Sequence, residues 1–444
     1  MKQHRTLIIL FALLLLHLTG FGHVDITAED SIPPIPLVTD TVLTIDSSNV
    51  IISDTDIVEY SGVEDPFIRY DLNHLEWGRD SMNLVHFFDR LREVMETKQG
   101  NIHIVHLGAS HVQAGTFTHR LRTNLLDEYG GPPAERGFIF PYYAAASCNN
   151  PNDYKISKRA NFNLIRNVYQ NYTFPLGGSG IAVWCSDTAN SITVKMNAPG
   201  YYFYADTIIL LGATHGWPID PILQYDTIYH FPDSEDLAHD RYFYYPIKPV
   251  RDFTIHFPCS ARDTFVVEGI LLRNGRSGIT VSSIGVNGAQ VTSYLRCKNF
   301  VRDWELIKPD LVIFGIGVND AYGSTFDSLA FKNNYLKLVA RIREVNPDCA
   351  FIFMSNNDTW KKGKKGKYYV NPTGPAVSDV MHRLANLTGG AVWDQFNIMG
   401  GLRSMNTWRK KGLAQKDYVH FTAAGYQQLG DLLFEAIINE IRRP

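Results

Sequence analysis

The feature that most constrains the fold of this chain is a long block of β-type sequence set between two stretches in which strand and helix patterns alternate. Ahead of the block, residues 101–107 alternate like a strand, and Phe117, Leu121 and Leu125 then recur at helical spacing. Beyond it, apolar runs suited to strands again alternate with amphipathic segments. This order predicts one α/β sheet domain interrupted by an insertion.

The interrupting block covers residues 155–283 and lacks helical periodicity. Short aromatic or β-branched runs are separated in it by turn residues, and Asn274-Gly275 between two such runs is typical of a hairpin turn. The length of the block suits a β-sandwich. We therefore predict an inserted β-sandwich at 155–283, with the α/β domain formed by residues 79–154 and 284–444.

The N-terminal segment has the layout of a secretory signal peptide. Lys2 and Arg5 precede the apolar run Leu7–Leu16, and small residues follow it. The run is shorter than the ~20 residues that a membrane span needs, although an uncleaved anchor is the alternative. We predict a signal peptide at 1–22, a linker or extension at 23–78, and an exported protein that is periplasmic, attached to the cell envelope or secreted. After removal of the signal we expect no stable membrane span.

The composition is that of a folded protein without an excess of basic charge. The chain is 45% hydrophobic and carries a net charge of −3, whereas nucleic-acid-binding domains usually have a basic excess. We therefore expect no nucleic-acid partner. The cysteines form neither a CxxC motif nor a paired metal spacing, and in an oxidising compartment they would permit one or two disulfides. They are Cys148, Cys185, Cys259, Cys297 and Cys349. Their pairing and the oligomeric state stay open.

Ser110 lies where the first predicted strand gives way to a helix. A serine at this position is most often a helix N-cap. A nucleophile would need a base and oxyanion donors elsewhere in the chain. Asp417 and His420 stand three residues apart just before the last predicted helix. A carboxylate at that spacing can orient an imidazole that acts as general base, although a surface Asp–His pair is the alternative.

Two further positions follow predicted strands and suit an oxyanion hole. Gly288 would let a backbone N–H approach a ligand closely, or it simply needs a positive φ. Asn319 follows a continuous apolar run, at the end of the strand where α/β sheets keep their sites, and would donate from its side chain or cap a turn.

Taken in this order, the serine, glycine, Gly-x-Asn-Asp and Asp-x-x-His blocks resemble those of the SGNH (GDSL-type) hydrolases. The resemblance covers about residues 82–150 and 283–440. It implies a flavodoxin-like three-layer α/β/α fold. It also implies that Ser110 is the nucleophile, that His420 is the base and that Asp417 orients it.

The same resemblance assigns the oxyanion hole to the backbone N–H groups of Ser110 and Gly288 and to the Asn319 side chain. Three segments look like those of bacterial peptidoglycan O-acetylesterases: HLGASHVQAG, SIGVNGA and IMGGLRSMNTWRKKGLAQKDYVHFTAAGY. A β-domain lies between the first and second, and in those proteins the insertion resembles a carbohydrate-binding module. This likeness implies an exported serine esterase that removes O-acetyl groups from a cell-envelope or extracellular polysaccharide and needs no cofactor. The alternatives are a polysaccharide O-acetyltransferase of the same fold and a catalytically weak glycan-binding envelope protein.

Ala109 departs from the family pattern, which usually has an aspartate before the serine. Without that carboxylate we expect the turn to be held by His111, Gln113 or the start of the helix. We also expect slow turnover, with Ala109→Asp raising kcat.

The remaining candidates are possible substrate contacts and a metal site. We assign His111, Gln113, Trp360 and Trp408 to substrate binding, with a core position as the alternative for Trp408. The segment WKKGKKGKYY, residues 360–369, is either a solvated loop or a lip that attracts an anionic glycan. His103, His106, His111 and His119 lack a recognisable ligand spacing, so we expect no metal.

Overall fold

The computed structural model describes residues 65–145, 151–196, 201, 203–260, 262–323 and 325–442. The predicted signal peptide, residues 23–64 of the predicted extension and Cys148 lie outside these residues. Across the described part of the chain, none of the helices combines the length and the apolar character that a membrane crossing requires.

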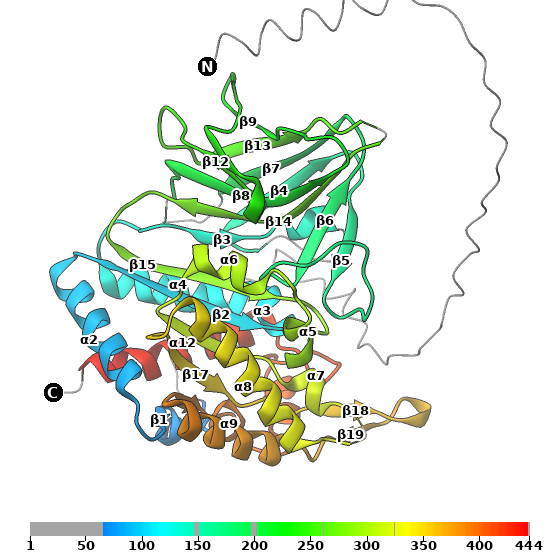
Figure 1. The fold of residues 1–444 in the computed structure, drawn as a ribbon. Coiled ribbons are helices and arrows are strands. Elements are labelled where there is room, and N and C mark those ends of the chain that lie inside the picture. The colour runs from blue at the N-terminus through cyan, green and yellow to red at the C-terminus, as the bar shows by residue number, and fades with distance from the viewer. Residues whose placement is uncertain are drawn as a thin grey trace, which may run out of the picture. The chain divides into compact units, whose positions relative to one another are not determined.

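A six-stranded sheet forms the centre of the α/β domain (Figure 1). Its strands, in spatial order, are β1 (Leu75–Trp77), β20 (Ala391–Trp393), β17 (Ala350–Met354), β16 (Leu311–Gly315), β2 (Asn101–Gly108) and β15 (Gly278–Gly285). Strand β1 is antiparallel to its neighbour, and the other five strands are parallel. In chain order these five follow the sequence 2-1-3-4-5, which is the flavodoxin-like arrangement.

Helices cover both faces of this sheet, because successive strand residues point to opposite sides. One layer consists of α2 (Met82–Thr97), α4 (Thr116–Tyr129) and α12 (Ala423–Arg442), and it packs on Leu311 and Ile313. The other layer consists of α6 (Phe300–Ile307), α8 (Ser328–Val345) and α9 (Gly374–Thr388), and it packs on Val312 and Phe314. Five short helices lie between these elements: α3 (Ser110–Gln113), α5 (Val291–Leu295), α7 (Val318–Ala321), α10 (Gln395–Ile398) and α11 (Ser404–Lys410). The predicted three-layer α/β/α fold is confirmed.

The insertion is a β-sandwich of two antiparallel sheets (Figure 1). One sheet contains β10 (Ile228–His230), β9 (Ile222–Tyr225), β13 (Asp252–Phe257), β7 (Asn190–Met196) and β4 (Tyr154–Arg159). The other contains β11 (Ser234–Asp236), β12 (Arg241–Tyr244), β8 (Thr207–His215), β14 (Thr264–Arg273), β6 (Ile181–Cys185) and β5 (Asn163–Arg166), with β3 (Gly137–Ile139) paired to β14. The predicted inserted β-sandwich is therefore present.

The observed boundaries of the insertion differ from the predicted ones. Strand β15 was expected to end the sandwich, but it pairs with β2 in the central sheet. Asn274-Gly275 consequently joins strands of two different sheets, and the expected hairpin is absent there. The sequence of β15 misled the prediction because a strand buried on both faces reads like the sandwich strands before it. Similarly, β1 lies within the predicted linker, and β3 pairs with the sandwich from ahead of residue 155.

Buried ionic contacts fasten the sandwich to the α/β domain. Arg302 of α6 forms ion pairs with Glu268 of β14 and with Asp240. Next to it, Trp304 donates its indole N–H to the carbonyl of Gly178 over 3.2 Å. Arg302 and Glu268 are little exposed, so the charges compensate each other where water is scarce. The insertion is thus packed against the sheet domain.

Candidate active site

Ser110 begins α3 immediately after β2, at the carboxyl edge of the parallel sheet. The turn before it is tightly packed, since a Cβ on Gly108 would lie 2.3 Å from Cγ2 of Val112 and 2.6 Å from the carbonyl oxygen of Gly315. The Tyr294 hydroxyl donates a hydrogen bond of 2.7 Å to the carbonyl of Gly108. These contacts fix the position of the serine at the end of the strand.

Ser110, His420 and Asp417 form a continuous chain of hydrogen bonds. Ser110 Oγ lies 2.8 Å from His420 Nε2, and His420 Nδ1 lies 2.7 Å from Asp417 Oδ2. The other carboxylate oxygen of Asp417 accepts the backbone N–H groups of Val419 and His420 at 2.9 and 3.0 Å. An imidazole held in this way presents its second nitrogen to the serine hydroxyl.

The electrostatics of this loop favour an ionised aspartate. Burial alone would raise the pKa of Asp417, but the hydrogen bond and charge of His420 and the two N–H groups lower it below its ordinary value. An ionised Asp417 can stabilise a positive charge on His420. His420 itself is buried, so its ring has little freedom to turn away from Ser110.

Three hydrogen-bond donors are available beside the serine. Among the described residues, the backbone N–H groups of Ser110 and Gly288 have no acceptor, and Gly288 adopts a φ of +81°, which suits a residue without a side chain. Asn319 Nδ2 donates to the carbonyl of Ala289 over 3.0 Å. An amide nitrogen carries two protons, so a second N–H of Asn319 remains for a ligand.

Further contacts tie these donor loops to one another. Gln113 Oε1 accepts the N–H of Asn287, one residue before Gly288, over 2.6 Å. The Asp320 carboxylate accepts the N–H of Val291 over 3.2 and 3.3 Å. Burial raises the pKa of Asp320 to about 7. The sequence analysis did not identify Asp320 and Tyr294 as positioning residues. The only sequence signal for either was that Asp320 directly follows Asn319.

The four predicted substrate contacts have different outcomes. Trp408 is fully buried and donates its indole N–H to the carbonyl of Met399 over 3.0 Å, so its assignment to substrate binding is wrong. Gln113 is also buried, and its amide supports the Gly288 loop. Trp360 is half-buried at the rim of the site, and its role stays a prediction.

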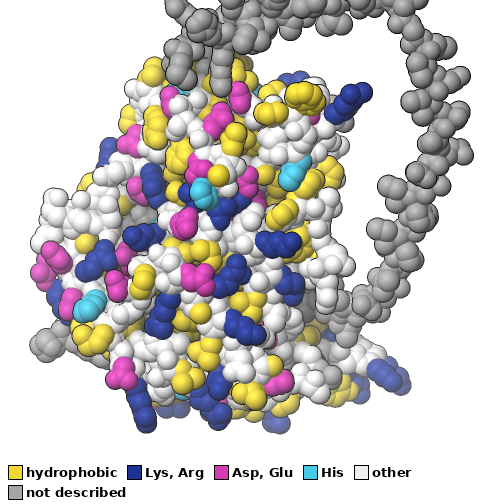
Figure 2. Space-filling model, viewed as in Figure 1, with side chains coloured by type: hydrophobic (Ala, Val, Ile, Leu, Met, Phe, Trp, Pro, Cys, Tyr) yellow, Lys and Arg dark blue, Asp and Glu magenta, His cyan; other side chains and the backbone are white. Residues whose placement is uncertain are grey.

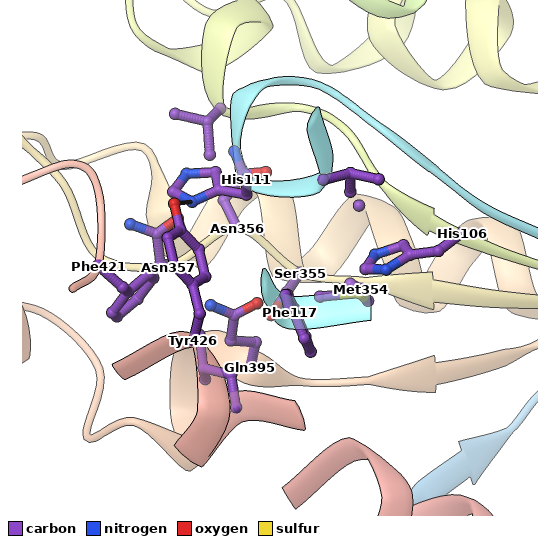
Figure 3. A pocket seen from close by; sticks show the side chains of 14 residues that line it. His106, His111, Phe117, Met354, Ser355, Asn356, Asn357, Gln395, Phe421 and Tyr426 are labelled. Carbon is purple, nitrogen blue, oxygen red and sulfur yellow. Dashed lines mark hydrogen bonds between the residues drawn. The ribbon is translucent and has the colours of Figure 1, made fainter. Parts of the chain in front are cut away.

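His111 lines a small cavity together with His106 and Tyr426 (Figure 3). Its Nδ1 lies 2.9 Å from the Tyr426 hydroxyl, and its ring centroid lies 5.1 Å from that of His420. Burial, assisted by the charge of His420, lowers the pKa of His111 to about 3. The cavity of about 20 Å³ has room for about one water molecule. His111 therefore packs behind the general-base candidate as a neutral ring.

Ala109 is buried within the apolar core cluster. Its carbonyl accepts the N–H groups of Val112 and Gln113 at 3.2 and 2.9 Å. The turn is therefore held by the start of the helix, which is one of the three supports expected from the sequence. Tyr294 supplies a further support that was not foreseen. A carboxylate at position 109 would be buried among apolar groups, which would cost stability. The expected rise in kcat for Ala109→Asp stays a prediction.

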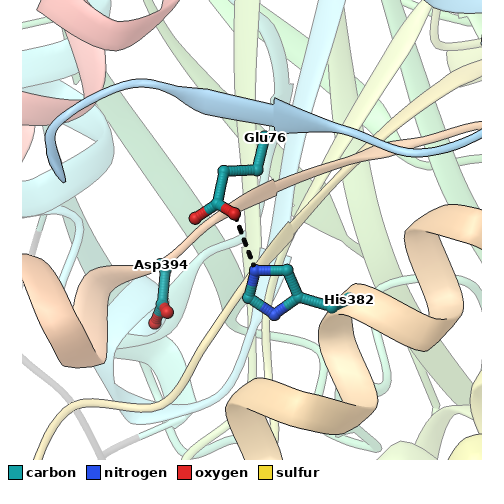
Figure 4. Close-up of side chains that lie close together, drawn as sticks. All are labelled: Glu76, His382 and Asp394. Carbon is teal, nitrogen blue, oxygen red and sulfur yellow. Dashed lines mark hydrogen bonds and ion pairs between the residues drawn. The ribbon is translucent and has the colours of Figure 1, made fainter.

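A group of three possible metal ligands lies elsewhere, at the sheet edge formed by β1 and β20 (Figure 4). Glu76 Oε2 lies 3.2 Å from His382 Nε2, and Asp394 lies close to both. Asp394, however, already accepts hydrogen bonds from the hydroxyls of Ser355 and Ser378 at 2.7 and 2.9 Å and from Asn397 at 2.6 Å. These bonds occupy its oxygens, so the group is a structural contact between β1, α9 and α10.

Comparisons with known proteins give one family profile and several similar solved structures. Residues 261–428 match the sequence profile of the GDSL-like lipase/acylhydrolase family. A solved structure titled "Peptidoglycan O-acetylesterase in action, 5 min" is 22% identical, with a TM-score of 0.64 over 80% of this chain and 96% of that chain. An acetyl xylan esterase (18% identity, TM-score 0.29) covers 36% of this chain and 81% of its own. A lipase/acylhydrolase from Enterococcus faecalis (21% identity, TM-score 0.28) covers 37% of this chain and 78% of its own. No curated protein sequence matches the chain.

Fold and family profile together define the class of this protein as a carboxylic ester hydrolase. More narrowly, residues 261–428 match the GDSL-like lipase/acylhydrolase family, and the sheet domain that contains most of them is interrupted in the sequence by the β-sandwich.

Proposed function

We propose that this protein is an exported serine esterase that removes O-acetyl groups from a cell-envelope or extracellular polysaccharide. The observation that carries the proposal is the hydrogen-bonded chain from Ser110 Oγ through His420 to Asp417. It lies beside N–H groups that have no acceptor among the described residues. A nucleophile, a base, a residue that orients the base and oxyanion donors are the parts that acyl transfer through serine requires.

In this mechanism Ser110 Oγ attacks the acetyl carbonyl carbon while its proton passes to His420 Nε2. The carbonyl oxygen becomes an oxyanion that accepts hydrogen bonds from Ser110 N–H, Gly288 N–H and the free N–H of Asn319. The bond to the sugar oxygen then breaks, and His420 returns the proton to that oxygen. Water, deprotonated by His420, attacks the carbonyl carbon of the acetyl-serine. The bond to Ser110 Oγ then breaks, acetate leaves, and His420 returns the proton to Ser110 Oγ.

A comparison of single and double variants tests this mechanism. With 4-nitrophenyl acetate, Ser110→Ala and His420→Ala should each lower kcat by about 10⁴-fold or more, and the double variant should be little worse, because the residues act as one unit. Ser328→Ala, on the exposed first turn of α8, is the matched control and should keep full activity. Losses that multiply in the double variant would contradict a shared mechanism.

The glycan part of the proposal is supported by the similarity to the peptidoglycan O-acetylesterase structure and by exposed aromatic residues of the sandwich. Tyr229, Phe231 and Tyr245 are each at least half exposed. Asp233 accepts the N–H of Tyr245 and contacts His230, which holds these segments together. Exposed apolar groups gathered on one surface often mark a binding site.

The test for this surface is the double variant Tyr229→Ala/Phe231→Ala. It should lower the ratio of kcat/KM on acetylated peptidoglycan to that on 4-nitrophenyl acetate. Equal losses on both substrates would mean that the sandwich shapes the catalytic site instead. Release of free acetate from the polymer separates hydrolysis from transfer to another sugar hydroxyl.

Export is supported by the charged start and apolar run of residues 1–22. Deletion of these residues should leave the protein in the cytoplasmic fraction of an expressing cell, whereas the full chain should be found outside it. Equal distribution of both forms would contradict export.

A further inference from the structure

A basic hairpin projects from the rim of the candidate active site. It consists of β18 (Trp360–Lys362) and β19 (Tyr368–Val370), joined by a lysine-rich turn. Five lysines stand on it: Lys361, Lys362, Lys364, Lys365 and Lys367. We call residues 360–370 the basic hairpin.

The root of the basic hairpin is fixed to two loops that carry the candidate catalytic residues. Trp360 N–H donates to the carbonyl of Tyr418, which lies between Asp417 and His420 in the sequence, over 3.1 Å. On the other side, Tyr322 lies three residues beyond Asn319 in the sequence. Its hydroxyl donates to the carbonyl of Trp360 over 3.1 Å. The hairpin therefore begins at the site itself.

Aromatic rings line the junction between the hairpin and the catalytic loop. Trp360 stacks on Tyr418 with centroids 5.0 Å apart, and Tyr368 lies 4.9 Å from the same ring. The Arg409 guanidinium lies 4.9 Å from the centroid of Tyr418 and donates to its hydroxyl over 3.0 Å. Aromatic side chains gathered in this way offer apolar surface with polar edges, as sugar rings require.

The charge of the hairpin is not compensated within the described part of the protein. Lys361 donates to the carbonyl of Gly323, and none of the five lysines forms an ion pair with a described residue. Figure 2 shows dark blue side chains at the place where Figure 1 has β18 and β19. In a chain of net charge −3, so many lysines in one turn form a local positive field.

We propose that the basic hairpin binds a carboxylate-bearing polysaccharide and holds it across the ester-hydrolysing site. This inference rests on the proposed function and narrows its substrate to a polyanionic glycan. The lysines attract the chain of carboxylates, and the aromatic junction contacts a sugar ring. The root is bonded to Tyr418 and Tyr322, so a sugar bound there would contact the loops that carry His420 and Asn319.

The test compares two sets of substitutions of equal charge. Lys362, Lys364, Lys365 and Lys367 are changed to Gln in one variant. In the control, Lys155, Lys195, Lys298 and Lys337 are changed to Gln; all four are exposed and distant in sequence from the hairpin. The substrates are O-acetylated polygalacturonate, neutral O-acetylated xylan and 4-nitrophenyl acetate, each at low and high salt.

We expect the ratio of kcat/KM on polygalacturonate to that on 4-nitrophenyl acetate to fall about 10-fold in the hairpin variant at low salt, and little in the control. High salt should lower the wild-type ratio toward that of the variant. Equal losses in both variants, or an equal preference for xylan, would overturn the proposal.

A binding measurement keeps this test independent of the proposed chemistry. Ser110→Ala protein should bind deacetylated polygalacturonate in a salt-dependent way, and the hairpin substitutions should weaken that binding about 10-fold. Tighter binding of inorganic polyphosphate or of single-stranded DNA than of polygalacturonate would overturn the assignment to a carboxylated glycan. Binding without any hydrolysis by the wild type would count against the esterase and leave the hairpin proposal standing.

Discussion

The donor loops beside Ser110 and the basic hairpin border the same site but are built in opposite ways. In the donor loops, Gln113, Asp320 and Asn319 each bond to the backbone of a neighbouring loop. In the hairpin, most of the charged side chains point to solvent without a partner among the described residues. Chemistry needs atoms held to a fraction of an ångström, because small displacements are costly in rate. Polymer capture needs only a field that acts over several ångströms.

Between these two regions, the larger effect is expected in the donor loops. Asn319→Ala should lower kcat by about 10²–10³-fold on 4-nitrophenyl acetate and on the polymer alike, as loss of one oxyanion donor does. Steady-state kinetics on both substrates provides the measurement, with Asn386→Ala on the exposed side of α9 as control. A loss confined to the polymer would place Asn319 with the capturing surface.

The second prediction concerns the buried turn before the serine. Ala109→Asp should lower the free energy of unfolding by about 1–3 kcal/mol, because it places a carboxylate among apolar groups. Thermal unfolding should show a lower Tm, and the loss should grow as the pH rises and the new carboxyl ionises. Ala109→Asn separates size from charge. An unchanged Tm would contradict this prediction, and faster turnover would support the expectation drawn from the sequence.

The third prediction concerns Asp320, whose pKa burial raises to about 7. The folded state binds the carboxyl proton of Asp320 more strongly than the unfolded chain does, because aspartates of the unfolded chain titrate near 3.9. Its contribution to stability is therefore present below pH 4 and is lost as the pH rises through about 7. Asp320→Asn keeps an acceptor for Val291 and removes the charge. The difference in Tm between the variant and the wild type should be several degrees more positive at pH 8.5 than at pH 5. The conversion is about 2–4 °C per kcal/mol. Parallel pH profiles would contradict this.

The smallest effect is expected outside both regions, at Glu76 and His382. Burial lowers the pKa of His382, but the Ser378 carbonyl and Glu76 outweigh this and raise it. The pair therefore stabilises the fold at pH values below the ordinary histidine pKa, and this contribution is lost as the pH rises through the raised value. Both side chains are more than a third exposed, so water screens the pair. Glu76→Gln should therefore cost about 0.5 kcal/mol or less at pH 6 and nothing at pH 9. Denaturant unfolding at the two pH values measures this, and a larger loss at pH 9 would contradict it.

The sequence allowed the sheet domain, the inserted sandwich and the residues brought together at the site to be predicted, because their patterns are local. Ser110 follows a strand, and Asp417 and His420 share one turn. The supports could not be predicted, because they depend on contacts between distant segments. Tyr294 bonds to a residue 186 positions away, and Gln113 to one 174 positions away. The prediction that Trp408 binds substrate was wrong because the residues around it in the sequence do not show that its side chain is buried.

The pairing of β2 with β15 governs the order in which this chain can assemble. Gly100 and Ser277, at the entrance to these strands, are hydrogen-bonded across 177 positions. Closing so long a loop is entropically costly, and slow folding goes with such distant contacts. The pairing of β3 with β14 brings the two strands of the split domain close from within the sandwich. Until β15 reaches β2, the strand that leads to Ser110 lacks its outer neighbour. An edge left open in this way can pair with other chains.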